Sequence, residues 1–429
     1  MAFVQTLLML VAIGLSELRA ETIDQTIPHL QFVAANYLAV PNPVQGVWPQ
    51  RGGPREVLAI VDVPSGRRKT FGRGWRVEHL LTTDESQKQF IVVCGTEELV
   101  QVRTVSYDGK ITATRDIPGL GGWTVQDLET FAASPDGRAV LYNDRASKCV
   151  YAIDLTTGER DPVLENVQVI LAQSFWVKPD TVVLAIWYDF AQSNSRANSI
   201  VAVDIAKKKT EVVYSGRNFA RLRATFALSP DRTSLLFTDQ MIEELKYPGL
   251  LVMDLQSGRT QLLKAPQEGV FINNPCWSAD GDRLAYVQHV QKKKPKLAEE
   301  ERERLLRDSL RLSKKETMTP GEAKRLQESL DMLVGPEYEV DTQVCIYSLA
   351  DGQVTCINDL PDDIWSYGLT FLDSARLVLE VEYDDERKRP ALLIVDTGSG
   401  KVSTLAKGWF IGDITSIDKG GKVICLMEE

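Results

Sequence analysis

Histidine is scarce in this chain, and several motifs of catalysis and metal binding are missing. Its 429 residues include three histidines, His29, His79 and His289, whose spacing matches no HxxxH metal site. No two of the six cysteines have the CxxC spacing of a zinc or thioredoxin-type motif. No GxSxG sequence marks the nucleophile of a hydrolase. These absences disfavour histidine-based catalysis, and the sequence predicts no cofactor.

Positive charge is also in deficit. Lys and Arg total 49 against 59 Asp and Glu, so the formal net charge is −10. An acidic chain repels the phosphate backbone, which disfavours a nucleic-acid partner. The basic run at 292–296 is followed at once by acidic residues at 299–303, so we interpret it as a solvated linker.

Hydrophobic runs are too short for a membrane span. The longest is an N-terminal stretch, Phe3–Leu15, of about 13 residues, against the roughly 20 that a spanning helix needs. Polar residues and Ala20 follow it, which predicts a signal peptide at 1–20 and export to the periplasm or the extracellular space. The alternative is an ordinary apolar strand or helix that packs on the fold, since no Lys or Arg precedes the run.

Two short units alternate along the rest of the chain. The first is a turn before an apolar strand, as in Ser134–Gly137, Ser229–Arg232 and Ser278–Gly281, and the second is a hairpin such as Val150–Glu159 or Leu250–Arg259. Each unit occurs seven times when weaker copies are included, and four of the turn aspartates are 44, 51 and 49 residues apart. Four strands in 40–50 residues is the period of a β-propeller blade.

The sequence therefore predicts an all-β fold, a seven-bladed β-propeller over residues 21–429. Along the chain, the first clear unit is a Gly-containing hairpin and the last is a turn before an apolar strand. The N- and C-terminal strands would therefore share one closing blade, which leaves no open sheet edge. Six or eight blades are the alternatives, because Leu30–Val40 is also strand-like. We expect the propeller to be monomeric.

The SPDG-type turns and the (I/M)DLxxG hairpins resemble the repeats of TolB-like and WD-type β-propellers over most of residues 55–427. The resemblance implies the fold and little about function, because propellers host many activities. It departs from TolB in leaving no room for a separate N-terminal α/β domain, so a TolB-like translocation role is not implied.

Long connections fall in one class. If the four strands of a blade are A to D from the centre outward, the long loops join B to C. Insertions on one face of a repeat protein often mark its binding face; drift in loop length is the alternative. The largest insertion, 292–339 in the sixth blade unit, predicts a helical hairpin, with a capping box at Thr319–Glu322 and an apolar stripe that includes Leu326 and Leu330.

Candidate binding residues follow from these loops. The apolar stripe packs on its partner helix, on the propeller face or on another protein. Aromatic residues also recur just ahead of the A strands, near the expected mouth of the central channel, either as packing between blades or as the lining of a pocket. We select as candidates Trp48, Tyr188, Phe190, Tyr247, Trp365 and Tyr383. The acidic cluster at Glu380–Glu386 has oxygen ligands suited to Ca²⁺, although adjacent Arg387–Arg389 favour a solvated loop instead.

One cysteine pair is placed for a disulfide. Cys345 and Cys356 flank the turn at 349–352, and counting outward from the turn sets them opposite each other. Two reduced cysteines in strand positions are the alternative.

Two function hypotheses remain. The first, which the absent motifs favour, is a non-catalytic exported propeller that binds a protein or other ligand through its B–C loops and the helical insertion. The second is a propeller enzyme, a lyase or lactonase-like hydrolase, with its site at the mouth of the central channel.

Overall fold

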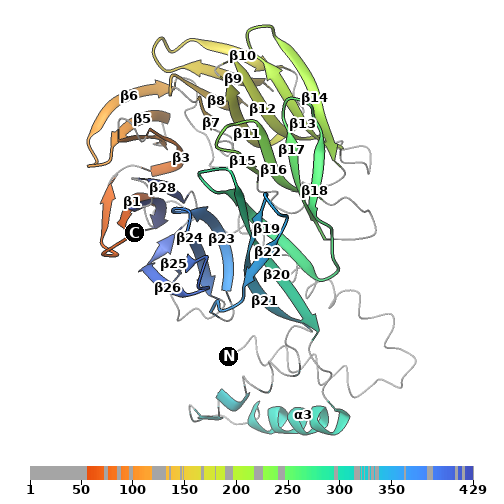
Figure 1. Ribbon diagram of the computed structural model, residues 1–429. Coiled ribbons are helices and arrows are strands. Elements are labelled where there is room, and N and C mark those ends of the chain that lie inside the picture. Colours follow the sequence, from red (N-terminus) through yellow and green to blue (C-terminus); the bar gives the residue numbers. More distant parts are fainter. Residues whose placement is uncertain are drawn as a thin grey trace. The chain divides into compact units, whose positions relative to one another are not determined.

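The computed structural model describes residues between Glu56 and Glu428, with its longer gaps at 118–131, 189–196, 217–225, 240–246 and 384–389. These residues form seven antiparallel sheets, which are the blades of a β-propeller (Figure 1). Six sheets have four strands, and one has five. The prediction of a seven-bladed propeller is confirmed. Trp48 and Leu30–Val40 lie outside the described residues.

Blade 1 closes the ring with strands from both parts of the chain. β29 pairs with β1 along seven residues, from Glu56 opposite Glu428 to Asp62 opposite Lys422. The blade consists of β27 (Trp409–Phe410), β28 (Thr415–Ile417), β29 (Lys422–Glu428), β1 (Glu56–Asp62) and β2 (Arg68–Phe71). This is the closure predicted from the order of the two repeat units.

The next three blades follow in chain order, each from its innermost to its outermost strand. Blade 2 has β3 (Arg76–Asp84), β4 (Gln89–Gly95), β5 (Val100–Ser106) and β6 (Ile111–Ile117). Blade 3 has β7 (Ala132–Ala133), β8 (Ala139–Asp144), β9 (Cys149–Asp154) and β10 (Arg160–Leu164). Blade 4 has β11 (Val169–Lys178), β12 (Thr181–Tyr188), β13 (Ala197–Asp204) and β14 (Lys209–Gly216).

Three further blades complete the ring. Blade 5 has β15 (Phe226–Leu228), β16 (Ser234–Asp239), β17 (Gly249–Asp254) and β18 (Thr260–Lys264). Blade 6 has β19 (Val270–Trp277), β20 (Arg283–Lys293), β21 (Tyr338–Ser348) and β22 (Val354–Ile357). Blade 7 has β23 (Ile364–Phe371), β24 (Arg376–Tyr383), β25 (Ala391–Asp396) and β26 (Val402–Lys407).

The turns between the two outer strands explain the second sequence repeat. In blade 5, Asp254 Oδ1 accepts a hydrogen bond of 2.6 Å from the backbone N–H of Ser257, and Gly258 follows with a φ of 67°. Only glycine adopts this left-handed conformation without strain, which accounts for the Gly of the motif. Hydrogen bonds from turn hydroxyls, lysine and backbone N–H groups lower the pKa of the equivalent carboxyls of Asp62, Asp154, Asp204, Asp254 and Asp396.

The turns between the two inner strands explain the first repeat. Ser229 is buried, and its Oγ accepts a hydrogen bond of 2.8 Å from the backbone N–H of Ser234, where the next strand begins. Ser134 and Ser278 do the same at their turns, with distances of 2.9 and 3.0 Å. Both repeated motifs therefore serve to make the turns of the fold.

Apolar side chains and a few polar ties join neighbouring blades. Val287 and Val344 of blade 6 pack in one buried cluster with Leu379 of blade 7. The indole N–H of Trp277 donates a hydrogen bond of 2.9 Å to the carbonyl of Ala227, and that of Trp176 donates one of 3.1 Å to the carbonyl of Ala132. Each tie links one blade to the blade before it, so these tryptophans hold the ring together.

The helical insertion lies between β20 and β21. Residues 291–339, which contain the insertion, belong to a different compact unit from the propeller strands. The insertion contains α3 (Glu299–Ser313) and, after Thr319, helical backbone at the described positions between Gly321 and Leu333. Thr319 caps this second helix, since its Oγ accepts from the N–H of Glu322 at 3.3 Å and its N–H donates to Glu322 Oε2 at 3.1 Å.

Candidate functional site

Blades 6 and 7 contain several buried or half-buried polar side chains that serve no repeated turn, and blades 4 and 5 contain others, such as Ser174 and Asp239. Those on blades 6 and 7 are Asn273 and Asn274 on β19, His289 on β20, Thr342 on β21, and Ser366 and Glu380 on β23 and β24. At these places a hydrophobic residue would continue the apolar packing between blades. Polar residues at positions that are otherwise apolar in the repeat often belong to a functional site.

An irregularity in the innermost strand of blade 6 starts this cluster. The pairing of β19 with β20 shifts between Asn273 and Cys276, and Asn274 has a φ of 48°. Asparagine tolerates this left-handed conformation better than most residues do. Asn274 Nδ2 then donates to the carbonyl and the Oγ of Ser366, at 3.1 and 3.0 Å, which ties blade 6 to blade 7. The Asn-Asn-Pro sequence thus forms a polar bridge between two inner strands.

A chain of hydrogen bonds runs from Asn273 to the next blade. Asn273 Nδ2 lies 3.3 Å from His289 Nε2, and His289 Nδ1 lies 2.9 Å from Thr342 Oγ1. Thr342 Oγ1 donates to the carbonyl of Ile364 at 3.1 Å. The Thr342 hydroxyl donates its one proton to the carbonyl of Ile364, so it must accept the hydrogen bond from His289 Nδ1–H. The lone pair of His289 Nε2 then accepts from the amide of Asn273. These hydrogen bonds therefore define one neutral tautomer of His289, with the proton on Nδ1.

Burial keeps this imidazole uncharged. His289 is 3% exposed, and burial lowers the pKa of His289 to about 4. Both ring nitrogens have hydrogen-bond partners, so at neutral pH this histidine holds three strands in place and offers no free lone pair for proton abstraction. Asn273 Oδ1 and Gln288 Oε1 are buried acceptors without a hydrogen-bond partner among the described residues. Each accommodates a donor from water or a ligand.

Glu380 of β24 is a buried carboxylate on the side of blade 7 that faces blade 1. It is 1% exposed and pairs with Gly368, where a Cβ would lie 3.2 Å from Glu380 Oε2. Burial and the nearby Glu380 charge raise the pKa of Cys425 on β29. The acidic cluster at Glu380–Glu386 was expected to be a solvated loop, but Glu380 itself is buried. Its members at 384–386 lie outside the described residues.

The candidate aromatic residues are only partly placed. Tyr247, just before β17, contacts Phe271 of β19 with ring centroids 4.9 Å apart, which joins blades 5 and 6 at the B–C end. Tyr383 ends β24, is half-buried and packs against the cluster between blades 6 and 7. Tyr188 and Trp365 lie on β12 and β23, but their side chains lie outside the described residues, as do Phe190 and Trp48 altogether.

Three leucines among the described residues of the insertion are buried. Leu305 and Leu312 of α3 are 7% and 5% exposed, and Leu326 of the second helix is 6% exposed. Leu330 lies outside the described residues. Leu306 and Leu310 of α3 are half-buried, and the exposed positions of this helix are mostly charged, with ion pairs such as Arg304 to Glu301 at 3.7 Å.

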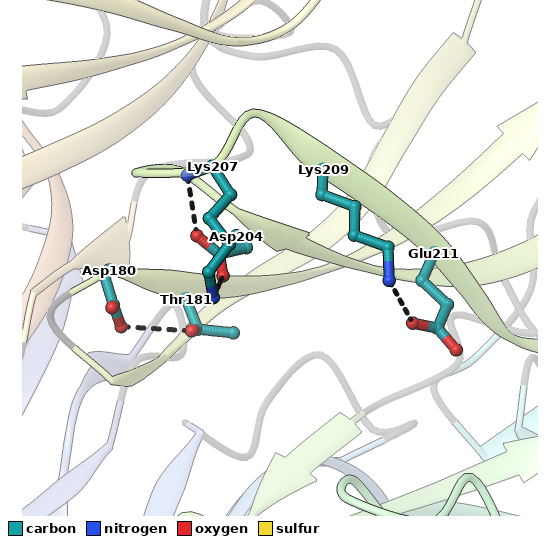
Figure 2. A network of polar contacts seen from close by, with 6 residues as sticks. All are labelled: Asp180, Thr181, Asp204, Lys207, Lys209 and Glu211. Atoms are coloured by element: carbon teal, nitrogen blue, oxygen red, sulfur yellow. Dashed lines mark hydrogen bonds and ion pairs between the residues drawn. The ribbon is translucent and has the colours of Figure 1, made fainter.

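An exposed polar network lies at the opposite end of the blades. In blade 4, Lys207 donates to Asp204 through its backbone N–H at 2.9 Å and its Nζ at 2.7 Å, and Lys209 lies 3.7 Å from Glu211 (Figure 2). The Lys207 ammonium lowers the pKa of Asp204, and Asp204 raises that of Lys207. Water and salt screen such exposed pairs, so this network contributes little to stability.

Metal-ligating residues do not converge in the described part of the chain, where no three His, Cys, Asp or Glu side chains form a group. Within the same residues, no helix is long and apolar enough to cross a membrane.

Comparisons with known proteins bear on the fold alone. No protein-family model matches the chain, and neither does any curated protein. Similar solved structures include an oligogalacturonate lyase in complex with manganese, at 11% identity and a TM-score of 0.54, covering 88% of this chain and 98% of that one. An oligogalacturonate lyase from Vibrio parahaemolyticus has 12% identity and a TM-score of 0.52, covering 87% and 97%. A TolB from Agrobacterium tumefaciens has 11% identity and a TM-score of 0.43, covering 88% and 99%.

The residues of the hydrogen-bond chain were not among the sequence candidates. Asn273, His289 and Thr342 are about 70 residues apart at most, and their partner Ile364 is in another blade. The signal available was local: Asn-Asn-Pro and Gln-His interrupt apolar alternation in two strands of one blade. Sequence reasoning instead favoured aromatic residues in loops.

Proposed function

We propose that this chain is a non-catalytic β-propeller that binds a protein partner, with the helical insertion of blade 6 as its binding arm. The observation that supports this proposal most directly is the unequal length of the strands in blade 6. Its two middle strands, β20 and β21, have 11 residues each and are the longest of the described strands, whereas β22 has four. The strands continue past the outer strand and carry a folded insertion with its own buried leucines.

The hydrogen-bond chain supports a fixed base for this arm. His289 lies one residue before Val290, where the first part of the propeller unit ends, and Thr342 lies two residues after Val340, where its second part begins. Their hydrogen bond joins β20 to β21 where the strands leave the blade, and Asn273 and Ile364 fix the same point to the inner strands. A base held from four strands costs little further entropy when a partner binds.

Loop lengths support the same face. Among the described strands, β12 to β13, β16 to β17, β20 to β21 and β24 to β25 are joined by the long B–C connections that the sequence predicted. The connections from β4 to β5 and from β8 to β9 are short. We further propose that the protein is exported, on the apolar N-terminal run and the disulfide described below, since disulfides persist in oxidising compartments.

A deletion tests the arm. Residues 294–337 are replaced by a short Gly-Ser turn, which antiparallel β20 and β21 accept, and binding partners of this variant and of the full chain are compared by quantitative affinity capture. We expect the partners of the full chain to be lost. The matched control is Lys209→Ala, on the exposed network at the opposite end, which should retain them. An unchanged partner list after deletion refutes the arm, provided that the circular dichroism of the propeller is retained.

A lyase is the second candidate, favoured by the buried carboxylate of Glu380 beside the inner strand. Its test is incubation of the purified chain with oligogalacturonate, with and without Mn²⁺, followed by the ultraviolet absorbance of an unsaturated product. Turnover that Glu380→Gln abolishes would replace the binding proposal with the lyase. The absence of turnover under both conditions leaves binding as the supported function.

A further inference from the structure

A disulfide joins the two outer strands of blade 6. Cys345 of β21 and Cys356 of β22 are directly opposed, with Cα atoms 4.1 Å apart, and their sulfur atoms are bonded. The sequence had left a disulfide and two reduced cysteines as alternatives. The bond lies within the blade that carries the insertion, on the strand β21 that leads out of it.

The two ends of this bond differ in their exposure. Cys345 is fully buried, in an apolar cluster with Leu236 and Leu250 of blade 5. Cys356 is exposed, as is its neighbour on the same face of β22, Val354, at 46%. Because disulfide exchange requires a thiolate to reach sulfur, access decides which end is attacked.

The remaining cysteines are poorly placed for the same reaction. Cys94, Cys149 and Cys425 are buried, and Cys276 is half-buried. Burial raises the pKa of Cys276 to about 12 and also raises that of Cys425. Thiols of this kind carry almost no thiolate at neutral pH and react slowly. Among the cysteines of this chain, Cys356 is therefore the one exposed to reagents.

Apart from the disulfide, few contacts hold the outer strand β22 in place. β22 has four residues, and Ile357 is its one buried side chain. Its backbone pairs with β21 only from Val344 to Tyr347. A short edge strand with little burial opens at low cost in free energy, so the disulfide is reachable without unfolding of the propeller.

We propose that the Cys345–Cys356 disulfide is a site of thiol–disulfide exchange, at which a low-molecular-weight thiol forms a mixed disulfide with Cys356. The incoming thiolate bonds to Cys356 Sγ, the bond between the two cysteines breaks, and Cys345 Sγ leaves as a thiolate that takes a proton from water. Cys345 attacks Cys356 in the reverse step and expels the thiol, which restores the disulfide. A second thiolate that attacks the mixed disulfide at the added sulfur completes the reduction and releases the oxidised thiol dimer.

Site mapping tests the direction of attack. The oxidised full chain is incubated with excess glutathione, quenched with acid, alkylated and digested for mass spectrometry. We expect glutathione on Cys356 and alkylation on Cys345, at denaturant concentrations where the propeller remains folded. Glutathione on Cys345 overturns the proposal, as does exchange that begins only when the protein unfolds. Six alkylated cysteines before glutathione is added would also overturn it, since no disulfide would then exist.

A matched pair of variants tests the difference in exposure directly. Cys345→Ser leaves the exposed Cys356 thiol, and Cys356→Ser leaves the buried Cys345 thiol. We expect Cys356 in the first variant to react with a chromogenic disulfide such as DTNB at least about tenfold faster than Cys345 does in the second. Equal rates refute the proposal. If either variant fails to fold, the mapping on the natural chain decides alone.

Discussion

Replacing Thr342 by valine removes the centre of the hydrogen-bond chain without a change of shape. Thr342 is 7% exposed, and its Oγ1 accepts from His289 Nδ1 at 2.9 Å and donates to the carbonyl of Ile364 at 3.1 Å. Valine has a methyl group in place of the hydroxyl, so Thr342→Val creates no cavity. It leaves a buried N–H and a buried carbonyl without this partner.

The expected loss follows from these two groups. A buried polar group left unsatisfied costs about 1–3 kcal/mol, and the added methyl group of valine returns about 1 kcal/mol. The two groups together cost about 2–6 kcal/mol, so the free energy of unfolding should fall by about 1–5 kcal/mol after the gain from the methyl group. At about 2 °C per kcal/mol for a large domain, the midpoint of thermal unfolding should fall by about 2–10 °C.

Urea unfolding followed by tryptophan fluorescence measures this loss. Thr355→Val is the control, because Thr355 is exposed on β22 of the same blade and should change stability by less than about 0.5 kcal/mol. A double-mutant cycle with His289→Phe then separates the shared hydrogen bond from the other effects. A loss for Thr342→Val no larger than that of the control would refute the hydrogen-bond chain as described.

Three further predictions concern pH and glycine. Between pH 6.5 and 4 the unfolded chain binds a proton that buried His289, with a pKa lowered to about 4, does not, so stability should fall with pH by up to about 3 kcal/mol; urea titrations should show this loss, and a flat profile relative to His289→Asn would contradict it. Gly368→Ala places a Cβ 3.0 Å from Ile414 Cδ1 and should cost about 1–3 kcal/mol by calorimetry, whereas Gly321→Ala, with nothing within 4 Å, should be neutral. The pKa of Asp254 is lowered from 3.8, so its turn stabilises the fold above its folded-state pKa and loses that effect as pH falls through it; the difference in melting temperature between the natural chain and Asp254→Asn should shrink below pH 3.8, and a constant difference would exclude the mechanism.

The blade count was predictable because its signals are local. Ser229 and Asp254 each bond to atoms within five residues, so the side chain and the turn it stabilises occur together in the sequence. Seven repetitions of such turns determine the number of blades, and their order determines the closure of β1 on β29. The opposition of Cys345 and Cys356 follows in the same way from the turn between them.

The candidate site was not predictable because its contacts cross blades. Asn274 contacts Ser366 across 92 residues, and Thr342 contacts Ile364 in the next blade. The local sequence does not indicate which residues of neighbouring blades will lie opposite each other. The expected acidic cluster shows the same limit, since alternation in β24 buries Glu380 against blade 1 whatever its neighbours in sequence are.

The sequence by itself determined the repeat, the seven-bladed ring, the place of the insertion and the scarcity of groups for histidine-based catalysis. Those properties depend on turn chemistry, strand alternation and composition, which act over a few residues. Only the tertiary structure decided that His289 is a neutral link between strands and that Cys356 is the accessible end of a disulfide. Both depend on burial by a neighbouring blade, and burial of a side chain is set by residues that are distant in the chain and adjacent in the fold.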